Sequence, residues 1–511
     1  MLPQGRSPAI VAELSALFPG RVSTTPPDRA AYARDLWPRT TIGLQRGKVA
    51  PAPPDAIVWP TTVEEIAEIV ARARTHGTPI VPFGAGSGVC GGALAIHGGL
   101  VVDLKRMRKL VTLDEVAGSA TFEAGILGEH LEHELSRRGF TMGHFPSSIM
   151  CSTFGGWLAA RSAGQLSTRY GKIEDMVRSL TFVDGRGQIH TLEAGATPDL
   201  AQLIVGSEGT LGIITSACAT IWRKPEIQLL RGWSFARLSA GLEAARRLLQ
   251  RGLRPSVLRL YDEFDSFMHR SEKRDHGHRR QNESGALDDA LASLKKHLFK
   301  AALGQPRLLN QLADGFLRTV HPGCLLIVGC EGARPLAEAE AADCATELVH
   351  AGGRDLGPGP GERWLAHRYR VSFRMSEVFD AGAFVDTMEV ATTWDRLLEL
   401  YYAVKQALAP YAFVMAHFSH AYPDGCSIYF TFASVGDAKL SAEERYDRIW
   451  QVGMQAALEV GATISHHHGV GLLKSRFMAD EHGGAMAIYR ALKQTLDPDD
   501  ILNPGKMGLP R

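Results

Sequence analysis

The sequence predicts an α+β protein with at least two domains. The chain of 511 residues is longer than a single hydrophobic core usually serves. Its composition, 45% hydrophobic and 22% charged, is typical of globular chains that bury large cores. Short apolar runs alternate with amphipathic segments over residues 55–225, and longer helical stretches between isolated strands follow from about residue 226. The alternation predicts a mixed domain of helices and strands, and the change of pattern predicts a second domain.

The first region contains one well-marked helix. Residues 61–77 begin with two threonines that can cap a helix, place Glu64 and Glu65 in the first turn, and repeat apolar residues at helical spacing. Strands of the same region are predicted from short apolar or β-branched runs at 57–60, 79–83, 100–104, 119–123 and 179–183.

The second region predicts a helix over 239–251, a buried strand over 324–331 and a strand over 458–464. Residues 268–283 are crowded with charge and histidine, which predicts an exposed or mobile loop. After them, Leu287, Leu291, Leu294 and Leu298 repeat on one helical face beside lysines. This pattern predicts either a packed surface helix or an element that covers a site or lies on a membrane.

Charge and cysteine content exclude several classes of function. A formal net charge of +1 without a long basic run argues against nucleic acid as a partner. The seven cysteines form no CxxC pair, which argues against a disulfide framework or structural zinc site and favours a reducing compartment. The sequence has no evident signal peptide, peroxisomal C-terminal signal or membrane-spanning run. We therefore expect a cytoplasmic protein that acts on a small molecule.

Three consecutive histidines, His466, His467 and His468, precede a Gly-Val-Gly turn. Imidazole changes charge near neutral pH, and each neutral ring donates at one nitrogen and accepts at the other. The run is internal and is framed by β-branched residues and glycine, so it differs from a terminal tag. Such a cluster is typical of acid/base catalysis, substrate binding or metal binding.

Three other segments together indicate a nucleotide site. Residues 82–88 (PFGAGSG) follow a strand-like run, and their glycines let backbone N–H groups converge on a pyrophosphate. Alone, this loop is equally consistent with a plain turn, because its spacing matches neither the dinucleotide-binding fingerprint nor the Walker loop. Segments 145–156 (FPSSIMCSTFGG) and 206–214 (GSEGTLGII) strengthen the interpretation.

These motifs resemble the FAD-binding family that includes vanillyl-alcohol oxidase and the D-lactate and glycolate dehydrogenase flavoproteins. Members of that family recognise FAD through P-x-G-x-G, S-T-x-G-G and G-S-E-G-T-L-G-I segments, all of which are present here. Within the family, the sequence is particularly similar to the alkyldihydroxyacetonephosphate synthases, because residues 143–157 read GHFPSSIMCSTFGGW and residues 170–175 read YGKIED. The resemblance covers about residues 56–471.

The resemblance implies a two-subdomain FAD-binding fold of the p-cresol methylhydroxylase (PCMH) type, with an α/β cap domain over the flavin. Its parts would be an N-terminal helical segment at 1–54, the FAD-binding domain at 55–225, the cap or substrate domain at 226–450, and a C-terminal segment at 451–511 that returns to the active site. FAD contacts are implied for Pro82, Phe83, Gly84, Ala85, Gly86, Ser87, Gly88, His144, Ser147, Ser148, Cys151, Ser152, Thr153, Gly155, Ala160, Arg161, Ser162, Ala163, Glu208, Gly209, Thr210, Leu211, Gly212, Ile213 and Ile214.

The resemblance also implies residues that act on the substrate. Tyr429 matches the family's catalytic tyrosine, and residues 465–471 match its essential S-H-H-H-G-V-G run without change, which makes His466, His467 and His468 catalytic. Arg374 matches a substrate-binding arginine across a one-residue gap, and Arg259 matches an arginine that supports the active conformation. His417 joins this substrate-binding set.

Each of these residues has a structural alternative. Tyr429 would serve equally as a core tyrosine with a satisfied hydroxyl, and Arg374 lies in an arginine-rich stretch that suits a solvated face. Arg259 alternates with leucines in a strand, where an ion pair with Asp262 would suffice. His144 precedes a Phe-Pro pair, where it could simply end a strand.

Cys151 stands where the family has an aromatic residue. The resulting C-S-T-F-G segment resembles the C-P-T-V-G segment of berberine-bridge-type oxidases, whose cysteine bonds to the flavin. The Gly-rich loop lacks the histidine that those enzymes use for a second attachment, and a buried thiol is usually a small apolar filler. We therefore expect non-covalent FAD.

The resemblance implies exchange of the acyl group of acyl-dihydroxyacetone phosphate for a fatty alcohol through a flavin N5 adduct, a step of ether-lipid synthesis. Tyr429, with a pKa lowered by the histidines or FAD, would accept a proton, and Arg374 would pair with the phosphate. We expect the protein to bind a lipid-like substrate, to form a homodimer and to contact a membrane surface peripherally.

The alternative is an FAD-linked dehydrogenase or oxidase of a 2-hydroxy acid or similar small alcohol. Such enzymes bind a divalent metal through an acid at the position of His467, so the sequence predicts no bound metal. Under this alternative, His417, His420 and the histidine run would be candidates for a zinc site.

Overall fold

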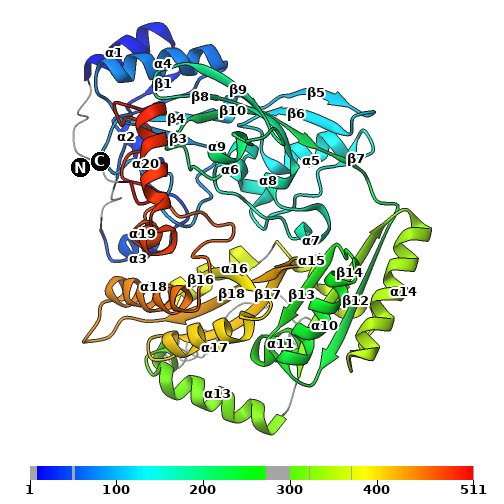
Figure 1. Ribbon diagram of the computed structural model, residues 1–511. Helices are drawn as coiled ribbons and strands as arrows, with labels where there is room; N and C mark the ends of the chain where they lie inside the picture. The colour runs from blue at the N-terminus through cyan, green and yellow to red at the C-terminus, as the bar shows by residue number, and fades with distance from the viewer. Residues whose placement is uncertain (1–7, 49–51, 272–299, 321–322, 370, 510–511) are drawn as a thin grey trace, which may run out of the picture. The chain divides into compact units, whose positions relative to one another are not determined.

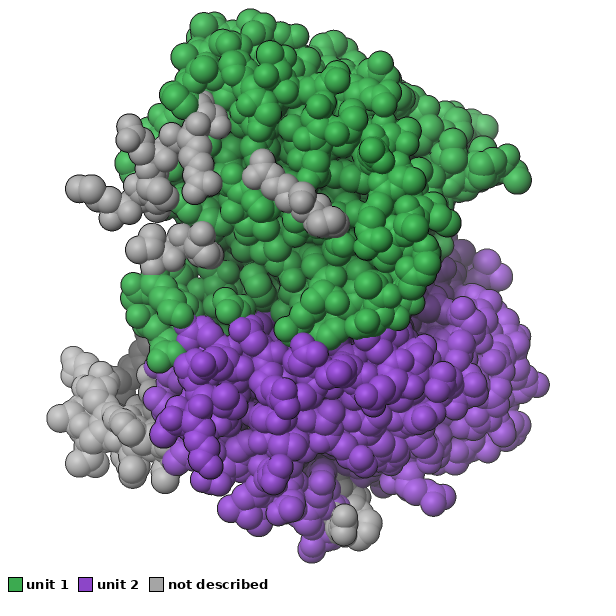
Figure 2. All heavy atoms as spheres, turned by 60° about the vertical axis from the view of Figure 1, so that its left-hand side comes forward, with its two compact units in different colours: residues 1–164, 170–224, 464–511 green, residues 165–169, 225–463 purple. Residues whose placement is uncertain are grey.

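The computed structural model describes residues 8–48, 52–271, 300–320, 323–369 and 371–509, which form two compact units. Unit 1 comprises residues 1–164, 170–224 and 464–511, and unit 2 comprises residues 165–169 and 225–463 (Figure 2). Helices make up 41% and strands 23% of the structure, so the α+β class is confirmed. The functional boundaries proposed at residues 54, 225 and 450 stay predictions.

Unit 1 is built on three sheets (Figure 1). One has the order β1-β2-β4-β3, with β2, β4 and β3 parallel and β1 antiparallel to β2. The second is antiparallel with the order β5-β6-β10-β8-β9, and β11 pairs with β7 in the third. The strands are β1 (Val22–Ser23), β2 (Ala56–Val58), β3 (Ile80–Phe83), β4 (Leu100–Asp103), β5 (Leu110–Asp114), β6 (Ser119–Glu123), β7 (Phe140–Thr141), β8 (Val177–Val183), β9 (Ile189–Glu193), β10 (Ile213–Thr220) and β11 (Trp222–Arg223).

Helices of unit 1 are short apart from α4 and α20. They are α1 (Pro8–Leu17), α2 (Pro26–Ala31), α3 (Pro38–Gln45), α4 (Val63–Thr75), α5 (Gly128–Ser136), α6 (Phe154–Ala159), α8 (Ile173–Met176), α9 (Ala201–Ile204), α19 (Met478–His482) and α20 (Ala485–Leu496), with 3₁₀ turns η1 (Leu104–Arg106), η2 (Ile149–Cys151) and η4 (Ser475–Phe477). The short α7 (Ser167–Tyr170) spans the boundary between the two units.

Helix α4 forms as its sequence predicts. The Thr62 hydroxyl accepts a hydrogen bond from the Glu65 N–H at 3.3 Å, which satisfies one of the free donors at the helix start. The apolar residues at helical spacing, Ile66, Ile69 and Val70, are fully buried. The strands predicted near 57–60, 79–83, 100–104, 119–123 and 179–183 are confirmed as β2, β3, β4, β6 and β8.

Unit 2 is built on a seven-stranded antiparallel sheet with the order β15-β12-β14-β13-β17-β18-β16. Its strands are β12 (Ile227–Phe235), β13 (Val257–Tyr261), β14 (Cys324–Gly332), β15 (Arg354–Asp355), β16 (Phe384–Thr393), β17 (Phe413–Ala421) and β18 (Gly425–Ser434). Its helices are α10 (Leu238–Gln250), α11 (Glu263–Ser271), α13 (Pro306–Val320), α14 (Arg334–His350), α15 (Gly359–His367), α16 (Val371–Asp380), α17 (Leu397–Leu408) and α18 (Ala442–Glu459). The predictions for 239–251 and 324–331 are confirmed as α10 and β14.

The two faces of the unit 2 sheet differ in chemistry. Side chains alternate along β17 and β18, so that Phe418, Phe430 and Phe432 are buried against aromatic residues of α17 and α18. Tyr429 and His417 are cross-strand partners on the opposite face. The strand period of two therefore separates an aromatic core from a face that carries titratable groups.

Three predictions for unit 2 need comment. The strand predicted over 458–464 is wrong, because the capping box of Ser441 and Glu444 starts a helix that runs to Glu459, and only Thr463 makes a β-bridge, to Ala391. Residues 268–271 belong to α11 rather than to a loop, and residues 272–283 lie outside the described residues. The helix predicted from Leu287 to Leu298 also lies outside them.

None of the helices in the described ranges combines the length and the apolar composition needed to cross a bilayer.

Candidate active site

The Gly-rich loop of unit 1 is packed too closely for side chains. A Cβ atom on Gly84 would lie 2.3 Å from the Thr153 hydroxyl oxygen, and one on Gly86 would lie 2.6 Å from the Phe83 ring. Gly86 also has a φ of +67°, which disfavours other residues. The N–H groups of residues 85 to 88 donate no hydrogen bond to any described residue. N–H groups without a hydrogen-bond partner among the described residues, on a glycine-rich backbone, fit a pyrophosphate.

Buried polar atoms in two other predicted FAD segments also lack partners. The Ser207 hydroxyl and His144 Nδ1 are buried without a hydrogen-bond partner among the described residues. The other His144 nitrogen lies 3.2 Å from the Ser162 hydroxyl, and the His144 ring packs 4.7 Å from the Trp157 ring. Burial lowers the pKa of His144 to about 3, so the imidazole is neutral at physiological pH. These atoms fit the polar edges of a bound flavin nucleotide.

The predicted FAD residues around η2 and α6 hold one another in place. The Thr153 hydroxyl caps α6 by accepting from the Gly156 N–H at 3.2 Å. The Ser152 hydroxyl accepts from Trp157 Nε1 at 2.8 Å and donates to the Ser148 carbonyl at 2.8 Å. Arg161 has a φ of +51° and directs its guanidinium to the Gln202 carbonyl at 2.6 Å. The segment 147–163 is therefore a rigid turn and helix start beside the Gly-rich loop.

The histidine run lies on a loop that a buried acid of the same unit holds. Glu208, from the predicted FAD segment 208–214, accepts hydrogen bonds from the Val470 N–H and, at 2.8 Å, from the Gly471 N–H. The Ser465 hydroxyl closes the loop on the Gly469 carbonyl at 3.0 Å. Burial raises the pKa of Glu208, although the two N–H groups oppose this shift. The predicted FAD segment and the predicted catalytic loop are thus joined within unit 1.

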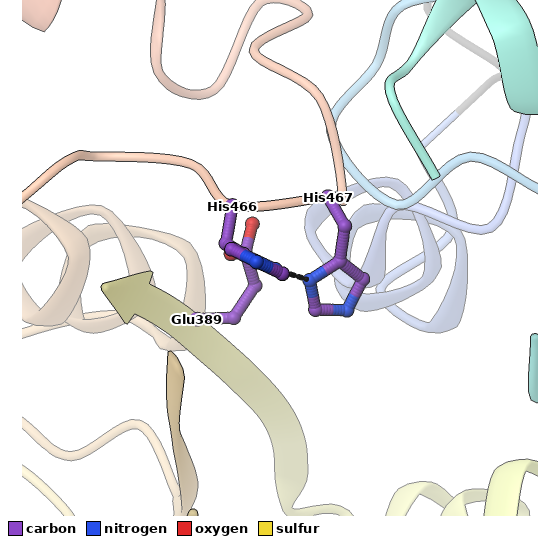
Figure 3. Close-up of side chains that lie close together, drawn as sticks. All are labelled: Glu389, His466 and His467. Atoms are coloured by element: carbon purple, nitrogen blue, oxygen red, sulfur yellow. Dashed lines mark hydrogen bonds between the residues drawn. The ribbon is translucent and has the colours of Figure 1, made fainter. Parts of the chain in front are cut away.

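The rings of the run contact one another (Figure 3). His466 Nδ1 and His467 Nδ1 lie 2.9 Å apart, so one of these nitrogens donates a proton and the other accepts it. The His467 and His468 ring centroids are 4.5 Å apart. Two neighbouring imidazoles that share one proton can pass a proton between them.

In unit 2, the polar face of the sheet joins three of the predicted substrate residues. The His417 and Tyr429 rings stack with centroids 4.8 Å apart and planes at 14°. Arg259 on β13 donates from Nη2 to His417 Nε2 at 2.5 Å. Because a guanidinium cannot accept, His417 carries its proton on Nδ1, which lies 3.6 Å from an Asp265 carboxylate oxygen. Burial and the Arg259 charge hold the pKa of His417 well below its usual range.

One N–H group of Arg259 makes no hydrogen bond to the described residues. Its Nε is buried and has no hydrogen-bond partner among the described residues. Arg259 and Asp262 are not held by an ion pair with each other, which was the alternative considered from the sequence. Asp262 instead accepts from the Ala416 N–H at 3.0 Å and from the Tyr401 hydroxyl at 3.1 Å. A part-buried cation with an unsatisfied donor suits an anionic oxygen of a substrate.

Within unit 2 the pKa of Tyr429 is raised, and the lowering expected from the histidine run or FAD stays a prediction. Burial and the neighbouring Glu389 carboxylate raise the pKa of the Tyr429 phenol, and the Arg259 charge offsets this only in part. Tyr429 therefore starts as a neutral proton donor. The remaining predicted substrate residue, Arg374, lies on α16, and its side chain is outside the described residues.

Comparison with known proteins identifies the family. Residues 54–193 match the FAD binding domain family, and residues 224–507 match the C-terminal domain of FAD linked oxidases. The chain belongs to the FAD-linked oxidase family. FAD is its cofactor, and the protein is an enzyme, as predicted.

Relatives of this chain include synthases and oxidoreductases. Alkyldihydroxyacetonephosphate synthase of Trypanosoma brucei brucei is 29% identical over 93% of the chain and 75% of its own length. Glycolate oxidase subunit GlcD of Bacillus subtilis is 28% identical over 89% of each chain. A solved structure of an alkyldihydroxyacetonephosphate synthase has a TM-score of 0.77 at 28% identity, covering 99% of this chain and 86% of its own.

The fold expectation is confirmed as well. A structure of p-cresol methylhydroxylase with substrate bound matches with a TM-score of 0.73 over 100% of this chain and 98% of its own, at 16% identity. At that identity the likeness concerns the fold alone, which is of the PCMH type.

Cys151 differs from the apolar filler expected, because the residue is exposed at the end of η2. We propose that the FAD-linked oxidase holds its flavin without a covalent bond. Acid precipitation of the protein is expected to release all flavin into the supernatant, and Cys151→Ala is expected to retain its flavin content. Flavin that stays with precipitated wild-type protein but not with Cys151→Ala would instead reveal a thioether.

Proposed function

We propose that this enzyme exchanges the acyl group of acyl-dihydroxyacetone phosphate for a fatty alcohol. The observation that carries the proposal is the group of Tyr429, His417 and Arg259 on one face of the unit 2 sheet. It combines a neutral phenol, a neutral imidazole with a fixed tautomer, and a part-buried cation with an unsatisfied N–H. A substrate that carries a phosphate and loses and gains oxygen substituents needs these three chemistries.

Bound FAD would supply an electrophilic ring for the ketose carbon. The residues that would hold it are the Gly-rich loop, His144, Ser207 and the segment 147–163, all in unit 1.

We assign the proton transfers to Tyr429. The fatty acid leaves as its carboxylate, hydrogen-bonded to the phenol. As the alcohol adds, the phenol oxygen takes the alcohol proton while its own proton passes to that carboxylate, so that protons balance over the cycle. The neutral His417 fixes the phenol ring by stacking, and Arg259 with Arg374 binds the phosphate oxygens. The proton-sharing pair His466 and His467 holds substrate oxygens.

A second candidate is the oxidation of a 2-hydroxy acid, which the likeness to the glycolate oxidase subunit favours. The Arg259 N–H would bind a carboxylate as well as a phosphate. A metal on His417, however, is disfavoured, because its Nε2 already faces the Arg259 cation at 2.5 Å.

One experiment separates the two candidates. Purified holoenzyme is incubated without oxygen with palmitoyl-dihydroxyacetone phosphate and labelled hexadecanol, and in parallel with D-lactate or glycolate. We expect labelled ether product while the flavin absorbance stays that of the oxidised form. Bleaching of the flavin by a hydroxy acid, with no ether product, would favour the oxidoreductase and exclude the exchange reaction.

A further inference from the structure

His420 occupies a position that a regular strand would not give it. β17 and β18 pair in register from Phe413 to Ser419, and the register then shifts between Ser419 and Ala421. His420 is the extra residue of this bulge. Its φ is +54°, in the left-handed region that a residue with a Cβ rarely adopts. A strained conformation of this kind persists only where the surroundings hold it, and such residues are common at functional sites.

The bulge directs a second imidazole to the phenol. In a regular strand His417 and His420 would point to opposite faces of the sheet, because they are three residues apart. The extra residue of the bulge brings the two side chains to the same face of the sheet. The His420 ring centroid lies 6.0 Å from that of Tyr429, on which His417 stacks at 4.8 Å. Two imidazoles from one strand therefore contact the same phenol.

A hydroxyl relay fixes the His420 ring. The Ser167 hydroxyl lies 2.8 Å from His420 Nδ1, and the Tyr422 hydroxyl donates to the Ser167 oxygen at 3.2 Å. Ser167 and His420 are both buried. The relay thus sets the orientation of the imidazole.

We infer that His420 is a positioning residue for Tyr429. The Ser167-anchored imidazole, acting with His417, holds the phenol ring in the orientation from which its hydroxyl transfers protons. This inference rests on the proposed function for the role of Tyr429, but the orientation itself can be observed without catalysis.

Three variants separate the ring from its anchor and from backbone strain. His420→Gly removes the imidazole and suits a φ of +54° better than histidine does. His420→Asn also tolerates this φ and keeps a polar group near Ser167. Ser167→Ala keeps the imidazole but removes its anchor. The matched control is Asp500→Gly, the same exchange at another left-handed position (φ of +49°) in unit 1.

We expect His420→Gly to lower kcat for ether formation by about 10²-fold with little change in KM, because a misoriented catalytic group affects the chemical step more than binding. Added imidazole should restore part of the lost turnover. Ser167→Ala and His420→Asn should lower kcat by smaller factors, and Asp500→Gly should not. Turnover near the wild-type value in His420→Gly would overturn the inference.

A spectroscopic measurement tests the orientation directly. Tyrosines are replaced by fluorotyrosine, and the ¹⁹F resonance of Tyr429 is assigned by its loss in Tyr429→Phe. The resonance should shift in His420→Gly and Ser167→Ala but not in Asp500→Gly. If the wild-type protein forms no ether product but the resonance still shifts in these two variants, the positioning role is supported and the proposed function is excluded. An unshifted resonance, with activity that falls only in proportion to the folded and flavin-loaded fraction, would indicate a structural role and overturn the inference.

Discussion

Replacing Tyr429 with phenylalanine is expected to lower kcat for ether formation by about 10²–10⁴-fold, the usual contribution of one acid–base group. The phenol lies between His417 and the Glu389 carboxylate, and burial keeps it protonated. Phenylalanine preserves the ring stack on His417 and removes only the proton that the exchange requires. The measurement is steady-state turnover of labelled hexadecanol by the flavin-loaded variant, with KM expected to change little.

The control for this variant is Tyr446→Phe. Tyr446 is also buried in unit 2, and its hydroxyl donates to Asp386 at 2.7 Å, on the aromatic side of the sheet. Loss of that bond should lower the free energy of unfolding by about 1–3 kcal/mol. It should leave kcat of the folded enzyme unchanged. Turnover near wild type in Tyr429→Phe would remove Tyr429 from the mechanism, whatever the control does.

Local patterns predicted much of the fold because the physics that fixes these elements is local. The capping threonine and the apolar spacing of α4 act within one helix, and the strands of 55–225 follow from short runs that bury both faces or one. The Gly-rich loop was found for the same reason, since steric room for a backbone is a property of the glycines themselves.

Features that depend on distant partners were missed. Residues 458–464 resemble a strand in sequence, but the helix that is capped at Ser441 continues through Leu458. The pKa of Tyr429 depends on Glu389 of a different strand, which the sequence does not place beside it. The bulge at His420 depends on the pairing of β17 with β18. Serine and histidine at 419–420 before a Tyr-Pro turn gave no signal of an extra residue in the strand.

The role of Glu208 was missed in a similar way. The sequence placed Glu208 in a FAD-binding segment, whereas in the structure its carboxylate binds two backbone N–H groups of the histidine loop. Gly469 was the available signal, because a residue without a Cβ lets the loop approach the acid closely. A Cβ on Gly469 would lie 2.4 Å from a Glu208 carboxylate oxygen.

Glu208→Ala is therefore expected to have the second largest effect. It leaves the Val470 and Gly471 N–H groups without acceptors, at a cost of about 1–3 kcal/mol for each buried donor. The loop that carries His466, His467 and His468 should then shift, and a shift of about 1 Å can lower kcat by about 10²-fold. The kcat of Glu208→Gln should lie between those of the wild-type enzyme and Glu208→Ala, because one amide oxygen can serve only one of the two donors well.

The comparison variant is Asp184→Ala, which distinguishes loop positioning from general destabilisation. Asp184 is a buried acid of the same unit, and it accepts from the Arg186 and Gln188 N–H groups at 2.9 and 2.8 Å, at a hairpin that carries none of the predicted site residues. Both variants lose two N–H acceptors, so both should lower the melting temperature. Only Glu208→Ala should lower kcat per bound flavin. Equal turnover per flavin in the two variants would mean that the position of the histidine loop does not limit catalysis, and the histidines would then lose their assigned role in holding substrate oxygens.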